Sequence, residues 1–152
     1  MPTNPSDRAP AKAASVQTAK VQWIGQQKFV AVGNSGHAVA MDSDRGSNTA
    51  PGAMEFLLLA LGACTATDVV IILEKKRQKL QSLEVVCSGE RAADPPQVWT
   101  KLNILYRLRG QLQEAGVKQA IQLSEEKYCS VSATLKKTAD LTWDYEILPP
   151  AD

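Results

Sequence analysis

The feature that most constrains this chain is the stretch from Met54 to Leu73, in which almost every residue is apolar. A helix of this composition has no polar face, so it must be buried on all sides. The stretch is also roughly long enough to cross a membrane. Asp68 would then lie deep in the bilayer at a cost of about 2.5–3.5 kcal/mol, so we expect no membrane insertion. The stretch predicts a core helix that begins near Pro51, a residue suited to a first helical turn.

Apolar runs with strand character lie on both sides of this helix. Residues 16–42 hold three short runs broken by turn residues, which predicts a three-stranded meander. Residues 83–91 and 98–108 alternate apolar and polar side chains across a turn that contains Pro95 and Pro96. This pattern predicts an antiparallel hairpin.

The rest of the chain predicts two helices and a last strand. Residues 114–127 carry apolar side chains at helical spacing, residues 130–138 form a second and shorter helix, and residues 141–148 form a strand. The predicted order is βββ-α-ββ-αα-β. It indicates an α+β fold with antiparallel sheets packed around the long helix.

The length of the chain suits a single domain, which we expect over residues 17–152. Residues 1–16 are rich in proline and alanine and lack the apolar run of a signal peptide, so we expect a disordered tail there. One small sheet can cover only one side of an all-apolar helix. We expect the remaining cover to come from a second copy of the chain, in a symmetric homodimer with the long helices side by side.

Charge and cysteine content narrow the class of function. Lys and Arg total 17 against 16 Asp and Glu, for a net charge of +1, so the basic excess that favours nucleic acid is missing. The three cysteines are an odd number with no close pair, unlike those of a small secreted disulfide-rich domain. We therefore expect at least one free thiol and a reducing, cytoplasmic location.

The three cysteines have different sequence surroundings. Cys87 shares an apolar strand face, which favours a structural role. Cys129 precedes the last short helix, whose unpaired N–H groups would stabilise a thiolate, so a reactive role and a structural role are both open. Cys64 follows Gly62 and Ala63, two small residues that would let another segment approach its sulfur closely. Asp68 lies one helical turn after Cys64, on the same face.

A carboxylate at the position of Asp68 argues against a reactive Cys64 unless another group compensates, since a nearby negative charge raises the pKa of a thiol. The one histidine, His37, follows a Ser-Gly pair and has no partner ligand in the sequence. It is expected to be a residue of a turn or of the start of a strand. The sequence predicts no metal site and no cofactor.

Two motifs resemble a known family. The run PGAMEFLLLALGAC at residues 51–64 and the run EKYCSVS at residues 126–132 resemble the two cysteine motifs of the OsmC/Ohr family, the osmotically inducible and organic hydroperoxide resistance proteins. The resemblance covers roughly residues 18–148. The SGH run at residues 35–37 and the MD run at residues 41–42 look like those of the OsmC-like branch, whose members are mostly uncharacterised.

The resemblance implies a thiol peroxidase that works as an intertwined homodimer. Cys64 matches the position that attacks the peroxide, and Cys129 matches the position that resolves the resulting sulfenic acid as a disulfide. The resemblance also implies a hydroperoxide substrate, an external thiol or dithiol reductant, and a role in oxidative or osmotic stress defence.

Glu55 matches the family's site glutamate, but it lies about 13.5 Å before Cys64 along an ideal helix and half a turn around it. Either the helix breaks between them, or Glu55 serves the Cys64 of a partner chain, which fits the dimeric site that the resemblance implies. The family's peroxidases also use an arginine from the N-terminal strands. This chain has no arginine between Arg8 and Arg45, and neither Arg45 nor Lys28 matches the motif.

Two alternatives stand beside the peroxidase. One is a redox-sensing or apolar-ligand-binding dimer of the same fold with slow thiols, which copurified lipid and negligible turnover would support. The other is a structural dimer whose cysteines fill the core. A sulfur separation far beyond disulfide reach would support the structural dimer.

Overall fold

The computed structural model describes residues 14–152 and has two compact units, which meet in the sequence between Ala53 and Met54 and are each described by themselves. The elements follow one another as β1, β2, β3, α1, β4, β5, α2, η2, α3 and β6, so the predicted α+β class and element order are confirmed. The predicted tail lies largely outside the described residues. Residues 14–16 carry no helix or strand.

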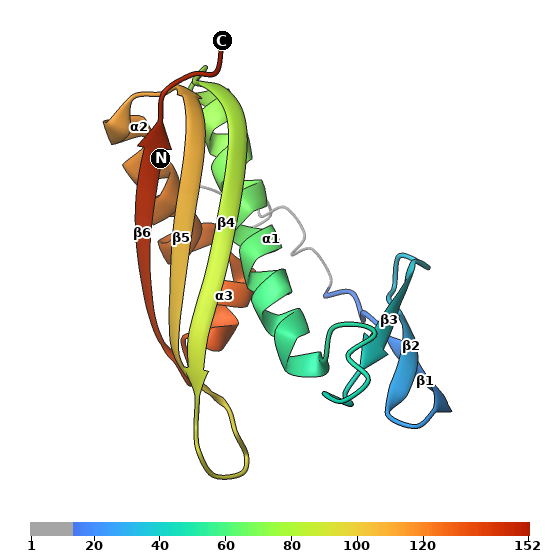
Figure 1. Ribbon diagram of the computed structural model, residues 1–152. Coiled ribbons are helices and arrows are strands. Elements are labelled where there is room, and N and C mark those ends of the chain that lie inside the picture. Colours follow the sequence, from blue (N-terminus) through green and yellow to red (C-terminus); the bar gives the residue numbers. More distant parts are fainter. Residues whose placement is uncertain (1–13) are drawn as a thin grey trace, which may run out of the picture. The chain divides into compact units, whose positions relative to one another are not determined.

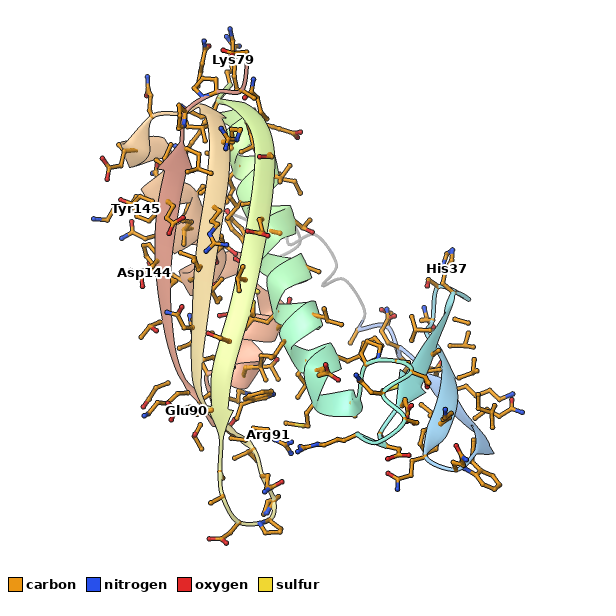
Figure 2. All side chains as sticks on the ribbon, viewed as in Figure 1. His37, Lys79, Glu90, Arg91, Asp144 and Tyr145 are labelled. Carbon is orange, nitrogen blue, oxygen red and sulfur yellow. The ribbon has the colours of Figure 1, made fainter. Side chains whose placement is uncertain are left out.

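The first unit contains an antiparallel sheet of β1 (Lys20–Gly25), β2 (Lys28–Val32) and β3 (Ala38–Asp42), in that spatial order. The predicted meander is confirmed. His37 directly precedes β3, with its Nδ1 atom 3.1 Å from the hydroxyl of Ser35. Figure 2 shows its ring at the end of this hairpin, pointing away from the strands. His37 therefore lies at the start of a strand, one of the two roles that the sequence predicted.

The polar loop after β3 is organised by Asp42. Its buried carboxylate accepts hydrogen bonds from the hydroxyls of Ser47 and Thr49 at 2.6 Å and from the Asp44 N–H at 2.9 Å. These bonds, with that from Ser47 the strongest, hold the pKa of Asp42 well below its usual range. The Nζ atom of Lys28 lies 3.1 Å from the Thr49 hydroxyl and 3.8 Å from the Asp42 carboxylate. Lys28 is thus held within this loop.

The second unit has a mixed three-stranded sheet. β4 (Lys79–Arg91) pairs antiparallel with β5 (Trp99–Gln111), as predicted for this hairpin. β6 (Asp140–Leu148) pairs with β5 in parallel. The expected antiparallel pairing of the last strand is therefore wrong. The helical segment between β5 and β6 is the long crossover that a parallel neighbour needs.

Four helical segments cover one face of this sheet: α1 (Ala53–Lys75), α2 (Glu114–Leu123), the π-helical turn η2 (Ser124–Tyr128) and α3 (Ser130–Leu135) (Figure 1). Central strand β5 supplies much of the core, because every second side chain faces the helices. Its almost fully buried residues are Leu102, Ile104, Tyr106 and Leu108.

One stripe of α1 is fully buried, at Leu61, Thr65, Val69 and Leu73. By length and composition alone α1 qualifies as a membrane span, yet only 28% of its most apolar window is buried within the chain. Large apolar side chains elsewhere on the helix stay exposed, among them Leu57, Leu59 and Ile71. Burial on all sides, which the composition of the helix predicted, is not reached within one chain.

Candidate functional site

The two motif cysteines come together from different elements of the second unit. Cys64 lies in the middle of α1, and Cys129 lies between η2 and α3. Their sulfur atoms and a carboxylate oxygen of Asp68 all lie within 4.8 Å of one another. All three cysteines are free thiols; Cys64 is half-buried and Cys129 is buried. The sequence-predicted approach of the two sulfurs is thus present within one chain.

A π-helical turn places Cys129. In η2 the backbone winds more widely than in an α-helix, and the Cys129 N–H donates to the Ser124 carbonyl at 2.8 Å. Cys129 then caps α3, because its sulfur accepts a hydrogen bond from the Ser132 N–H at 3.3 Å. The sequence predicted the helix-terminal position of Cys129. It gave no sign of the π turn, because the apolar spacing of residues 114–127 fits an ordinary helix.

Burial raises the pKa of Cys129 from 9.0 to about 12. The hydrogen bond from the Ser132 N–H acts in the opposite direction, as the sequence predicted for a helix N-terminus, but it is the weaker effect. The neighbouring Cys64 thiol and the negative charge of Glu125 raise the pKa further. Cys129 therefore carries its proton at neutral pH.

Asp68 shares a helix face with Cys64, as its spacing predicted, and is held by a chain of hydroxyl groups. The Ser124 hydroxyl donates to Asp68 Oδ2 at 2.9 Å. The Thr65 hydroxyl lies 2.8 Å from that of Ser124 and 2.5 Å from that of Tyr106. These hydrogen bonds fix the carboxylate beside the two sulfurs.

The hydroxyl chain ends at a second carboxylate, that of Glu125, whose side chain is only 2% exposed. Tyr106 donates to its Oε1 atom at 3.2 Å, and Ser132 donates to its Oε2 atom. The Nζ atom of Lys136 lies 3.2 Å from Oε2 and balances the buried charge. Burial raises the pKa of Tyr106 above its usual value, so it remains a neutral hydroxyl. Three adjacent hydroxyl groups thus lie between Asp68 and Glu125, and the single Thr65 proton is donated to either Ser124 or Tyr106 at one time.

Apart from Asp68, no site role was predicted for the members of this hydrogen-bonded network, which include Thr65, Tyr106, Ser124 and Glu125. Tyr106 did carry a signal, because it alternates with apolar residues on the inward face of its strand, and a buried tyrosine hydroxyl needs a partner. Ser124 carried a signal as well, because it continues the helical spacing of the buried residues Val117 and Ile121. Glu125 carried none.

The structure does not bring Glu55 to the thiols of its own chain. Glu55 is exposed in the first turn of α1. The helix runs without a break from Ala53 to Lys75, so the alternative in which it breaks between Glu55 and Cys64 is excluded. Of the two cations considered from the sequence, Arg45 is exposed in the first unit and Lys28 is held there by Asp42.

Cys87 has other surroundings. It is half-buried on β4, and a Cβ atom built on Gly62 would lie 3.4 Å from its sulfur. The small residue in α1 therefore makes room for β4 and Cys87, whereas the expected approach of another segment to Cys64 stays a prediction. Burial, with a contribution from the charge of Glu125, raises the pKa of Cys87 to about 11.

Comparison with known proteins agrees with this architecture. The model of the OsmC-like protein family matches residues 46–144. Protein YhfA of Escherichia coli K12 is 40% identical over 131 residues, which cover 86% of this chain and 97% of the relative. Two solved structures are also similar. A hypothetical protein from Aquifex aeolicus has a TM-score of 0.82 at 28% identity and covers 91% of this chain and 100% of its own.

The second structure is an organic hydroperoxide resistance protein, OsmC, from Legionella pneumophila. It has a TM-score of 0.64 at 14% identity and covers 89% of this chain and 99% of its own, so it shares the fold. OsmC-family proteins are soluble, which supports α1 as the core helix of a soluble protein. With the family match and YhfA together, the chain belongs to the OsmC-like protein family, which includes hydroperoxide resistance proteins.

Proposed function

We propose that this protein is a thiol-dependent peroxidase of organic hydroperoxides, in which Cys64 attacks the peroxide and Cys129 resolves the product. The observation that carries the proposal is the approach of the Cys64 and Cys129 sulfurs within 4.8 Å. The name of the Legionella relative, an organic hydroperoxide resistance protein, supports the class of substrate.

The two thiols differ in the way that a two-step reaction needs. Cys64 is half-buried and within reach of a small substrate, whereas Cys129 is buried and keeps its proton. Attack by the Cys64 thiolate breaks the O–O bond, and the alkoxide takes up a proton and leaves as the alcohol. The Cys64 sulfenic acid then condenses with the Cys129 thiol, which releases water and forms a disulfide. A dithiol reductant returns both cysteines to thiols by exchange.

We assign Glu55 to the site of a second copy of the chain. Within one chain α1 keeps Glu55 away from Cys64, and the exposed apolar residues Leu57, Leu59 and Ile71 leave a surface for a second helix. The homodimer is thus part of the proposal, and sedimentation equilibrium tests it. If the protein is a monomer at micromolar concentration, the assignment of Glu55 to the site of a second copy is wrong.

A slow redox sensor of the same fold is the second candidate. It is favoured by Asp68 beside Cys64, which disfavours a thiolate, and by the lack of an arginine between Arg8 and Arg45. A sensor would form the disulfide once and turn over negligibly with a reductant. In either case the free thiols suit a reducing compartment, and we propose the cytoplasm.

The test is consumption of cumene hydroperoxide in the presence of a dithiol by the wild type, Cys64→Ser and the matched control Cys87→Ser. We expect Cys64→Ser to lose at least about 100-fold in rate, because no thiolate remains to attack. Cys87→Ser should stay within about twofold, as expected for a residue outside the reacting centre. Equal rates for the wild type and Cys64→Ser would remove the catalytic role of Cys64.

A further inference from the structure

Three side chains that bind thiophilic metal ions converge in the second unit. The sulfur atoms of Cys64 and Cys129 and a carboxylate oxygen of Asp68 lie within 4.8 Å of one another. In a tetrahedral zinc site with Zn–S bonds of about 2.3 Å, two sulfur ligands lie roughly 3.8 Å apart. The three atoms therefore need to move inward by about 1 Å or less to hold one ion.

Hydrogen bonds already orient two of these three side chains. The Ser124 hydroxyl donates to Asp68 Oδ2 at 2.9 Å, and the Ser132 N–H donates to the Cys129 sulfur at 3.3 Å. Contacts of this kind fix the direction of metal ligands in known sites and contribute to affinity. The cluster thus has both the ligand types and the supporting contacts of a metal site.

The cluster borders a surface cavity through Asp68. Asp68 lines a cavity of about 350 Å³ together with Lys75, Lys76 and Tyr128, among others, and Cys64 is half-buried. Two thiolates and one carboxylate carry three negative charges, so a divalent cation leaves one. The cavity lining includes two lysines, Lys75 and Lys76, which make this side of the cluster less negative.

We propose that the fully reduced protein binds one Zn²⁺ ion per chain through Cys64, Asp68 and Cys129, with water at the fourth position. Three protein ligands and an open position are the arrangement found in catalytic zinc sites. The sequence predicted no metal because its one histidine, His37, had no partner ligand. The set proposed here contains no histidine and is assembled from α1 and the junction before α3.

The ion and the peroxide compete for the same two sulfurs. The zinc-bound thiolates supply two electrons to one hydroperoxide, and with two protons the products are the Cys64–Cys129 disulfide, the alcohol, water and free Zn²⁺. Zinc thereby protects the thiols, and oxidation releases it. The proposal that Zn²⁺ binds depends only on the three side chains. The proposed effect of Zn²⁺ on peroxide reduction rests on the proposed function.

The test uses Co²⁺ as a spectroscopic substitute for Zn²⁺, added without oxygen to the reduced protein. One equivalent should produce sulfur-to-cobalt charge-transfer absorption and the intense visible bands of tetrahedral cobalt, and Zn²⁺ should abolish both. Cys87→Ser should keep this spectrum, whereas Cys64→Ser and Cys129→Ser should lose it. Asp68→Asn should weaken Co²⁺ binding by more than about 100-fold, beyond the 10–100-fold loss typical of an outer partner of a metal ligand.

Wild type oxidised with diamide provides a version of the test without substitutions, and it should show no cobalt absorption. The proposal is overturned if the reduced wild type shows no sulfur-to-cobalt band, or if Cys64→Ser keeps the band. Full affinity in Asp68→Asn overturns the three-ligand site. If peroxide forms the disulfide but Co²⁺ does not bind, the metal site is refuted and the peroxidase is not. If Co²⁺ binds but peroxide is not consumed, the peroxidase is refuted and the metal site is not.

Discussion

Two cysteine regions of the second unit differ in one instructive respect. Cys87 is half-buried and Cys129 is buried, and burial raises the pKa of each, to about 11 and about 12 respectively. Cys129 nevertheless has a second thiol, a carboxylate and a capping N–H as neighbours. Cys87 lies outside this cluster, and its sulfur instead faces α1, 3.4 Å from a Cβ atom built on Gly62.

Burial and pKa therefore do not separate a chemical cysteine from a structural one in this fold. The separating property is the set of groups within reach of the sulfur. A thiol with a raised pKa can still react with a sulfenic acid if the protein holds the thiol beside that acid. Positioning speeds this reaction because the two groups need not meet by diffusion.

The largest effect is expected on replacing the buried thiol of the pair. Cys129→Ser should lower steady-state peroxide turnover by at least about 100-fold, because an external thiol at millimolar concentration must replace one held in contact. Cys64 should then accumulate as sulfenic acid, which dimedone labelling and mass spectrometry detect. The matched variant Cys87→Ser should show neither change. Turnover at the wild-type rate in Cys129→Ser would place the resolving thiol elsewhere.

An intermediate effect is expected in the network behind the pair. Glu125→Ala should cost about 3–5 kcal/mol of unfolding free energy, because it leaves Lys136 and two hydroxyl groups without their buried carboxylate. Cys87→Ala, which removes only packing, should cost about 1–2 kcal/mol. Urea denaturation measures both. Equal losses would mean that the network stabilises the unit no more than the contacts of Cys87 do.

The smallest effect is expected at the contact between α1 and β4. The added methyl of Gly62→Ala would lie 3.4 Å from the Cys87 sulfur, an ordinary contact, and alanine is favoured over glycine inside a helix by about 0.8–1 kcal/mol. The variant should be more stable by up to about this amount, with peroxide turnover unchanged. A tenfold slower reaction would indicate that Gly62 serves Cys64 after all.

Much of the fold was accessible from the sequence because its periodicities are strong. The apolar run of α1, the period-two alternation of β4 and β5 and the turn residues of the first sheet each select one element type. The parallel pairing of β6 was missed because pairing direction depends on what connects two strands, and strand periodicity is the same in both cases. The sequence-predicted second copy around α1 stays a prediction.

Part of the candidate site could be predicted from the sequence, because spacing on one helix and a short motif were sufficient for it. Cys64 and Asp68 share a helix face by simple spacing, and the motif around Cys129 identified the second sulfur. The network of Thr65, Tyr106 and Glu125 was not accessible, because three elements converge there through tertiary packing. Local patterns report which way a side chain points on its own element, and they do not report which other elements lie opposite.

The most direct test of the central claim is a map of the cysteine states after one equivalent of cumene hydroperoxide is added to the reduced, metal-free protein. Non-reducing peptide mapping by mass spectrometry reads all three cysteines at once. We expect a disulfide between Cys64 and Cys129 of one chain, with Cys87 remaining a free thiol. A disulfide that contains Cys87, or a Cys64 oxidised to sulfinic acid beside a free Cys129, would contradict the account.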